Sequence, residues 1–407
     1  MEPVTAPDIP IGKRVKFYRE GRGLSQADLG SRVSLAEDYI SQIERGARTP
    51  PIATLQRIAR VLGTSISALL GHPTVEGVVG DPAAAHIYRA LTDVANRRQT
   101  ANGPPDLLKL REDVDQAWTI WQGGEGTYTR TGRLLPDLIL LIERARHSYH
   151  TPAETDLRRE AARIAADGYF LVRMFCSYIG RGDLALLAAD RANRAAEDSD
   201  DLLRLGRAAW DVSYGLMRDC EFEGAEQIAL QAIAELEPQA TDDHPELLAM
   251  YGQLQLHSAL VAVRQSDPWT ARQLIRDKAL PAARAVGDGN VMWTAFGPTN
   301  CAIHLVAIEM EAGHAIEGIR LADQVDVALT PVTERRCRHY MEVAKCYDLK
   351  HDDMGTLTHL RLAWDSAPEH LQHNPLVRDM VHGLLHRARP SYAPEVRNLA
   401  NRIGLTA

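Results

Sequence analysis

The chain has 407 residues, of which 45% are hydrophobic and 25% are charged, with a net charge of −8. These values are typical of a soluble globular protein with two or three domains. The first residues lack the basic and apolar regions of a signal peptide, and no run of about 18 apolar residues predicts a membrane span. The cysteines are odd in number and show no metal-site spacing, so we expect a reduced, cytoplasmic chain without disulfides: Cys176, Cys220, Cys301, Cys337 and Cys346.

The charge is unevenly distributed along the chain. Residues 1–71 hold ten Lys/Arg and seven Asp/Glu, a balance of +3, so the remainder carries −11. A basic head on an acidic body favours contact of the head alone with an acidic polymer, although a small excess of this kind is common.

Residues 10–71 carry five short helical patterns, after residues 1–9, which we expect to be disordered. The patterns cover residues 11–20, 26–33, a segment from the turn at Ser34 to about residue 44, 52–62 and 66–70. Ser25 and Asp28 have the spacing of a capping box at the second helix, and Gly46 is a left-handed helix stop.

The segment LSQADLGSRVSLAEDYISQIERGARTPPIATLQRIARVLG resembles the XRE/Cro-C1 helix-turn-helix family over nearly the whole of residues 10–71. The resemblance implies that the third helix reads the major groove of double-stranded DNA and that Arg19 and Glu44 form a structural ion pair. It assigns DNA contacts to Gln26, Glu37, Asp38, Ser41, Gln42, Arg45, Arg48, Thr49, Arg14 and Lys16.

Two of these residues have a second interpretation. Glu37 and Asp38 could accept hydrogen bonds from cytosine, but acidic residues also favour the first turn of any helix, and Ser34 and Glu37 have capping-box spacing. The sequence favours capping for Glu37 and leaves Asp38 open. Gln42 is the residue that we expect to discriminate adenine.

Residues 72–82, rich in glycine and proline, read as a linker, and residues 83–158 as a helical connecting region. Helices are predicted at residues 83–98, 107–121 and 134–148. The sequence GGEGTYTRTG between the last two is predicted to be a flexible connection, because it lacks the Lys-Ser/Thr of a phosphate-binding loop.

Residues 159–407 contain no segment with strand periodicity. Helical patterns come in pairs: 160–179 with 183–197, 202–219 with 223–236, 246–265 with 268–286, 291–312 with 315–327, 333–350 with 353–364, and 375–388 with 393–403. The turns within the pairs recur at intervals typical of a tetratricopeptide array. We therefore predict an all-α fold, a five-helix bundle followed by an α-solenoid that binds an effector and mediates dimerisation.

The first helix of each pair lines the concave groove of such arrays. Aligning the turns assigns effector contacts to Arg207, Trp210, Tyr214, Met217, Gln253, His257, Asn300, His304, His339 and Glu342. Aromatic residues and histidines at helical spacing are more often part of a core, so a packing role stands beside each assignment. Asn300 lies in an apolar run, where its amide needs partners.

The sequence holds no catalytic arrangement, and His370-x-x-His373 lies in a predicted loop with little metal-binding character, so we expect no enzyme, metal or cofactor. The architecture resembles the RRNPP peptide-responsive regulators. That resemblance implies a homodimeric transcription regulator that binds a palindromic operator and senses a short peptide or small molecule. The alternative is a DNA-tethered scaffold whose repeats bind a protein partner.

Overall fold

The computed structural model describes residues 10–64, 66–70, 82–93, 103–124, 126–149, 151–219 and 221–405, and all regular structure within them is helical. The all-α prediction is confirmed. The N-terminal bundle consists of α1 (Ile11–Gly21), α2 (Gln26–Arg32), α3 (Glu37–Glu44), α4 (Ile52–Leu62) and α5 (Ile66–Leu70). The predicted linker, residues 72–82, lies outside the described residues except for its last position.

Local signals set the boundaries of the bundle helices. The capping box at α2 is confirmed, because the Ser25 hydroxyl accepts from the Asp28 amide and the Asp28 carboxylate accepts from the Ser25 amide. Gly46 ends α3 with a φ of 70°. The predicted capping box of Ser34 and Glu37 is wrong: Ser34 is itself left-handed (φ 56°), and α3 begins after Ala36 without a side-chain cap.

The remaining helices form one continuous winding. They are α6 (Pro82–Thr92), α7 (Leu107–Gln122), α8 (Thr127–Arg146), α9 (Thr155–Tyr178), α10 (Gly182–Ser199), α11 (Leu202–Arg218), α12 (Phe222–Leu236), α13 (Pro245–Arg264), α14 (Pro268–Leu274), α15 (Leu280–Val286), α16 (Pro298–Glu311), α17 (Ala315–Ala322), α18 (Thr333–Leu349), α19 (Asp353–Ser366), α20 (Pro368–Gln372), α21 (Pro375–Arg387) and α22 (Ala393–Arg402). Short turns join them: η3 (Pro152–Glu154), η4 (Glu237–Gln239), the π-helical η5 (Ile275–Ala279), η6 (Val291–Trp293) and η7 (Val327–Leu329).

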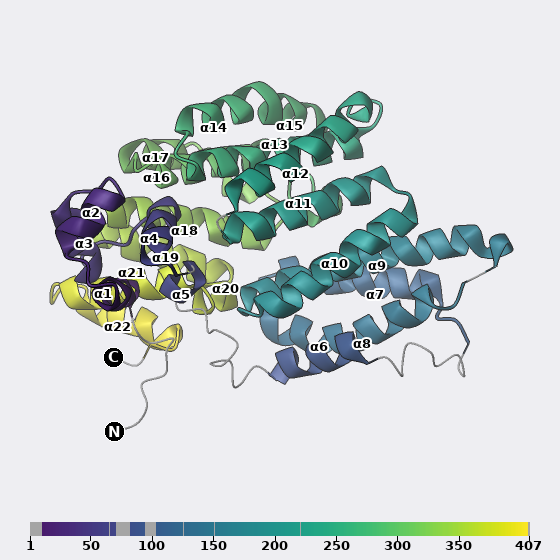
Figure 1. The fold of residues 1–407 in the computed structure, drawn as a ribbon, viewed down its shortest axis with the longest axis horizontal. Coiled ribbons are helices and arrows are strands. Elements are labelled where there is room, and N and C mark those ends of the chain that lie inside the picture. Colours follow the sequence, from purple (N-terminus) through teal and green to yellow (C-terminus); the bar gives the residue numbers. More distant parts are fainter. Residues whose placement is uncertain are drawn as a thin grey trace.

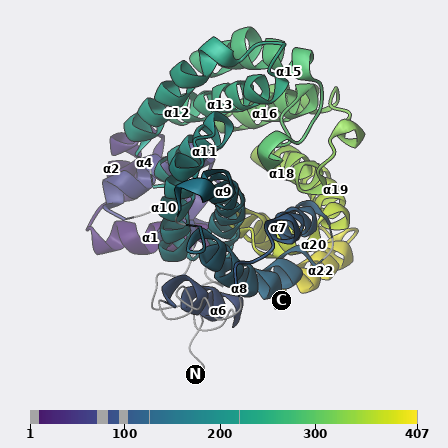
Figure 2. The same ribbon diagram turned by 90° about the vertical axis from the view of Figure 1, so that its right-hand side faces the viewer.

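These helices wind around a common axis (Figures 1 and 2). One apolar core runs from α6 through α16, and a second joins α18 to α22. The expected division between residues 158 and 159 falls inside α9, and the helices before it share its core.

Two predicted boundaries are wrong. Residues 127–132 of the predicted flexible connection are instead the start of α8, where Gly132 faces Ala83 and Phe175 so closely that a Cβ would lie 2.8 Å and 2.9 Å from them. The predicted helix at residues 291–312 is broken before Pro298, and Trp293 there stacks on Trp118 with ring centroids 4.6 Å apart.

His370 is also not in a loop. It lies in α20 and is buried against Tyr128 and Trp121. The segment Val291–Glu311 is the one stretch of the described residues long and apolar enough to cross a membrane, and 67% of its most apolar window is buried in the protein. Its composition therefore follows from its place in the core.

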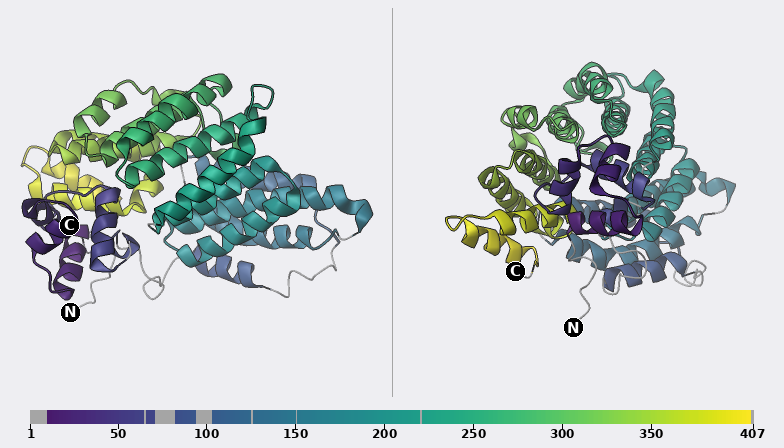
Figure 3. Two further views of the ribbon diagram at one scale, coloured as in Figure 1. Left: turned by 45° about the horizontal axis from the view of Figure 1, so that its top comes forward. Right: turned by 60° about the vertical axis from the view of Figure 1, so that its left-hand side comes forward.

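The N-terminal bundle packs on the body (Figure 3). The Asp379 carboxylate of α21 accepts from the amide of Ile11 at 2.9 Å and lies 3.5 Å from the Thr49 hydroxyl. The Glu311 carboxylate of α16 accepts from the amide of Ala53 at 3.2 Å, in the first turn of α4. Leu376 joins the apolar core of the bundle. The bundle is thus held at both α21 and α16.

Candidate DNA-binding face and effector cavity

Helix α3 presents the candidate base-reading residues on one exposed face. Glu37, Asp38 and Arg45 are exposed, and Ser41 and Gln42 are half-buried. Ile40 and Ile43 fix this orientation because they are fully buried on the opposite face. The face remains open although the bundle is packed on the body.

Gln42 and Asp38 act on each other. The Gln42 amide nitrogen donates to the Asp38 carboxylate at 2.6 Å, one helical turn earlier, and Arg45 approaches that carboxylate at 4.0 Å. One N–H and the carbonyl oxygen of the Gln42 amide stay available, and these are the groups that a bidentate contact to adenine requires. Asp38 thus has a role that the sequence did not indicate: it orients the neighbouring amide.

A buried ion pair inside the bundle stabilises α3 behind its exposed face. Arg19 donates to both carboxylate oxygens of Glu44 at 2.5 Å and 2.9 Å, which confirms the expected structural pair. The pair raises the pKa of Arg19, chiefly through this hydrogen bond. Gln26 donates to the same carboxylate at 2.7 Å, so its amide is partly engaged inside the bundle.

The other candidates for DNA contact differ in availability. Lys16 is exposed, and its ammonium lies 3.8 Å from the Glu20 carboxylate. Arg48 is half-buried, and its guanidinium lies 4.3 Å from the centre of the Tyr39 ring. Arg14 donates to the carbonyl of Leu69 and Thr49 faces Asp379, so both are turned toward protein groups.

A cavity of about 260 Å³ lies on the inner side of the winding. By the same measure, one water molecule needs about 10–15 Å³, so the space is large enough for a ligand. Its wall comes from α7, α9, α11, α13, η6, α16, α18, α20 and α21, and the N-terminal bundle contributes Ile52 and Leu70. The N-terminal bundle (α1–α5), called the reading domain from here on, and the helical body (α6–α22) therefore share one cavity.

Six of the ten predicted effector contacts line this cavity: Trp210, Tyr214, Gln253, His257, His304 and Glu342. The Trp210, Tyr214 and His257 rings lie within 6.4 Å of one another, centroid to centroid. Burial lowers the pKa of His257 to about 3 and that of His304 to about 4, and nearby guanidiniums act in the same direction. Both imidazoles are therefore neutral at physiological pH.

The other four candidates lie outside the cavity wall. Arg207 is fully buried with its guanidinium 4.5 Å from the Trp210 ring centre, and Met217 packs in a small apolar cluster. Asn300 is buried with neither side-chain oxygen nor nitrogen paired, and His339 is buried with an unpaired Nδ1. The packing interpretation describes Arg207 and Met217 well, whereas the Asn300 amide, for which the sequence predicted a need for partners, has none among the described residues.

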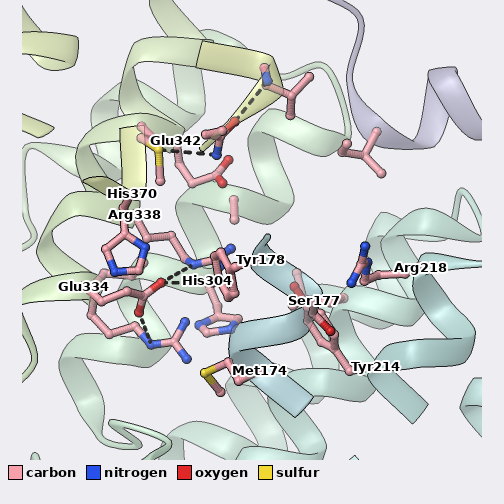
Figure 4. Close-up of a pocket in the computed structure, with 18 of the residues that line it drawn as sticks. Met174, Ser177, Tyr178, Tyr214, Arg218, His304, Glu334, Arg338, Glu342 and His370 are labelled. Atoms are coloured by element: carbon pink, nitrogen blue, oxygen red, sulfur yellow. Dashed lines mark hydrogen bonds and ion pairs between the residues drawn. The ribbon is translucent and has the colours of Figure 1, made fainter. Parts of the chain in front are cut away.

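Several wall residues were missed from the sequence. In Figure 4, Tyr178 and Arg338 converge on Glu334, from α9 and α18. Arg338 donates to the Tyr178 hydroxyl at 2.8 Å and to Glu334 at 3.3 Å. Burial raises the pKa of Glu334, but Arg335 and Arg338 outweigh burial and hold it at about 2. The helical spacing of the α18 residues 334, 338, 342 and 345 carried the signal that would have found this part of the wall.

Comparisons with known proteins support the assignment of the N-terminal bundle as a helix-turn-helix domain. A helix-turn-helix family model matches residues 15–69. The regulator DdrOP3 of Deinococcus deserti is 30% identical over 106 residues, which cover 25% of this chain and 78% of that protein. The immunity repressor of Bacillus phage phi105 is 27% identical over 115 residues, covering 28% and 72%. SinR of Bacillus subtilis is 39% identical over 61 residues, covering 15% of this chain and 55% of SinR.

Solved structures match more of the chain but only distantly. Bacillus thuringiensis PlcR, solved with the peptide PapR7 and DNA, is 14% identical, with 86% of this chain and 99% of PlcR covered and a TM-score of 0.30. Yeast Tom70 is 13% identical, covering 94% and 92%, with a TM-score of 0.36.

The class defined by the bundle and its relatives is a transcriptional regulator with a helix-turn-helix DNA-binding domain. The chain belongs to the family of HTH-type transcriptional regulators.

Proposed function

We propose that this regulator responds to an effector: a small molecule or short peptide binds in the cavity of the helical body and alters how the reading domain meets its operator. The observation that carries the proposal is the shared wall. Ile52 of α4 and Leu70 of α5 line the same cavity as Trp210 and Tyr214 of α11. A ligand in that space contacts both parts of the molecule, so its binding energy depends on where the reading domain sits.

Glu311 provides a polar route between the same two parts. One of its carboxylate oxygens accepts from the Ala53 amide at 3.2 Å, and the other lies 3.9 Å from Arg264 across the cavity wall. Burial raises the pKa of Glu311, and Arg264 and Lys345 oppose this effect. A ligand that engages Arg264 changes the environment of the carboxylate that holds the start of α4.

We further propose that the regulator binds DNA as a homodimer on a palindromic operator. A single helix-turn-helix head makes few base contacts, and dimers place two heads about one helical turn apart on the duplex. In this chain, α3 also carries Glu37 and Asp38 on its exposed face, which weakens one head alone near phosphates.

The experiment measures binding of the full chain to DNA upstream of its own coding region by fluorescence anisotropy, with and without fractions of a culture extract. We expect one fraction to change the apparent Kd. The cavity variant Ala307→Phe fills the space and should abolish that change. The control Ala285→Phe makes the same substitution at an exposed position of α15 outside the cavity wall.

A response that survives Ala307→Phe in a folded protein would remove the cavity from the mechanism. If no fraction acts and a stoichiometric protein co-purifies with the body instead, the scaffold alternative replaces effector sensing.

A further inference from the structure

The cations of the cavity wall outnumber its carboxylates. Six basic side chains line the space, Arg173, Arg218, Arg264, Arg335, Arg338 and Lys345, against three acidic ones, Glu311, Glu334 and Glu342. Three lining histidines, His257, His304 and His370, have pKa values lowered by burial to about 3 or 4, so they add no charge at neutral pH. The excess positive charge is therefore carried by the arginines and the lysine.

Most of these cations are already neutralised by the chain. Arg338 and Arg335 lie 3.3 Å and 3.6 Å from Glu334, and Lys345 lies 2.8 Å from Glu342. Arg173 is paired with Asp211 behind the wall. These pairs account for two of the three wall carboxylates.

Arg218 and Arg264 remain. Among the described residues, Arg218 makes no hydrogen bond or ion pair, and in Figure 4 its guanidinium stands alone beside Tyr214. Arg264 makes no side-chain hydrogen bond there either, its Nε is buried without a partner, and its nearest carboxylate, Glu311, is 3.9 Å away. Charge-assisted hydrogen bonds of guanidinium are strong, and both groups leave theirs unmade.

Helical spacing brings these two guanidiniums to the same end of an apolar strip. Arg218 follows Tyr214 by one turn of α11, and Arg264 follows Leu260 by one turn of α13, while Tyr214 and Leu260 pack in one cluster. Trp210 continues the strip one turn earlier, with its ring centre 6.0 Å from that of Tyr214. Burial raises the pKa of Tyr214, but Arg338, Arg264, Arg218 and Arg173 together lower it. The phenol therefore lies in a positive field.

We propose that the effector is an anionic amphiphile, a carboxylate joined to an aromatic or branched apolar body, whose carboxylate lies between Arg218 and Arg264 and whose body lies on Trp210, Tyr214 and Leu260. This inference rests on the proposed effector role of the cavity and specifies its ligand. A neutral ligand leaves Arg218 without an anion and Arg264 with only the Glu311 carboxylate at 3.9 Å, and a cation meets the positive field. Carboxylates of this kind occur in free aryl or fatty acids and at the C-terminus of a short hydrophobic peptide.

The site lies next to the reading domain. Among the described residues, the one carboxylate within 4 Å of Arg264 is Glu311, which also accepts from the amide of Ala53. The bound carboxylate competes with Glu311 for Arg264, so occupancy of this end of the cavity acts on the hydrogen bond that holds α4.

The test compares dansyl-phenylalanine, which has a free carboxylate, with dansyl-phenylalaninamide, which does not, by fluorescence titration of the full chain. We expect the carboxylate probe to bind about tenfold more tightly or better, since hydrogen bonds to charged groups are worth that factor. Arg218→Gln and Arg264→Gln should each remove most of the preference. Arg276→Gln should keep it, because Arg276 is exposed, pairs with its exposed neighbour Asp277 and does not line the cavity.

Two variants are used because Arg264 is largely buried and its replacement could disturb folding, whereas Arg218 is half-buried without a partner. Equal binding of both probes, a preference that survives in both variants, or no binding of either probe would overturn the proposal. Displacement of the probe by phenylbutyrate or by acetyl-leucyl-phenylalanine then separates the two sources of carboxylate.

The failures of the two proposals differ. If an extract fraction shifts DNA binding but the carboxylate preference is absent, the ligand class is wrong and effector sensing stands. If the preference follows Arg218 and Arg264 but no ligand or fraction affects DNA binding, the anion site stands and the sensing role falls.

Discussion

The arginines of the reading domain and those of the cavity are used in opposite ways. In the bundle, Arg19 donates through Nε and one terminal nitrogen to Glu44, at 2.5 Å and 2.9 Å, and through the other to the Leu24 carbonyl at 2.6 Å. In the cavity, Arg218 and Arg264 make no side-chain hydrogen bond among the described residues. The arginines of both regions lie beside carboxylates or aromatic rings, so the type of neighbouring side chain does not distinguish the two groups.

The difference separates charges that stabilise the fold from charges left for a ligand. A buried guanidinium with every donor satisfied is bound to one geometry, and removing its partner leaves an uncompensated charge. A guanidinium whose donors are open at the edge of a cavity contributes little to folding and retains its capacity for an anion. Stability measurements can therefore test the assignment of each arginine without knowledge of the ligand.

The largest expected effect is in the bundle. Glu44→Ala leaves Arg19 buried without its carboxylate, so it should lower the free energy of unfolding of the reading domain by about 3–5 kcal/mol. Chemical denaturation followed by circular dichroism measures this loss. The matched substitution Arg218→Ala should change the free energy of unfolding by less than about 0.5 kcal/mol. Similar losses at the two sites would break the comparison, because Arg218 would then be part of the fold.

Gln42 is expected to have the next largest effect, on sequence preference rather than stability. Gln42→Ala removes the exposed amide that Asp38 orients at 2.6 Å, so discrimination at one base position should fall by about 1–3 kcal/mol. Selection from a randomised operator library measures the preference. Asp38→Asn is the companion variant: it keeps an acceptor for the Gln42 amide and should retain more of the preference than Asp38→Ala. An unchanged operator sequence with Gln42→Ala would remove this residue from readout.

The bundle was predictable because its signals are local. Helices α4 and α5 have the expected bounds, and the Ser25 capping box, the Gly46 stop and the Arg19–Glu44 pair were all identified from short spacings. The exception is the start of α3, where Ser34 took a left-handed turn that the capping pattern did not reveal.

The cavity was only partly predictable because it depends on how far the winding closes. Alignment of the repeat turns identified wall residues on α11, α13 and α16 and Glu342 on α18. It missed Glu334 and Arg338 of α18 and Tyr178 of α9, which meet across 156 residues of sequence or more. The contribution of Ile52 follows from docking of the bundle, for which the sequence holds no local signal. The close approach of Gly132 in α8 to Phe175 in α9 likewise joins residues far apart in the sequence.

The pH dependence of docking between the N-terminal bundle and the body tests which group Asp379 resembles: the satisfied charges that stabilise the fold, or the unsatisfied charges of the cavity. Burial raises its pKa to about 6 from 3.8, opposed by the Ile11 amide, while Asp348 raises it further and Arg14 and Thr49 lower it. A raised pKa means that the docked state prefers the protonated carboxyl. Docking is therefore strongest at low pH and weakens as the pH rises from 3.8 through about 6.

If Asp379 recovers a pKa of 3.8 on undocking, the docking equilibrium constant should fall about fourfold between pH 5.5 and pH 7.5. Energy transfer between fluorescent labels on α2 and α22 reports the docked fraction. Asp379→Asn should remove most of this pH dependence. A dependence of the same size in that variant would assign it to another group.

The smallest expected effect concerns Arg48, whose guanidinium the chain satisfies less fully than that of Arg19. Its guanidinium is 4.3 Å from the centre of the Tyr39 ring and its Nε is buried without a partner, so the chain satisfies it only in part. If its remaining donors contact phosphate, Arg48→Ala should weaken binding to all DNA sequences alike and reduce the slope of log affinity against log salt by about one. Anisotropy titrations over a range of salt concentrations on specific and random duplexes measure both quantities. The control Lys16→Ala removes an exposed cation beside Glu20 and should act on the slope in the same way, without the loss of a ring contact. A change in sequence preference with Arg48→Ala but not with Lys16→Ala would instead assign Arg48 to base readout or to the positioning of Tyr39.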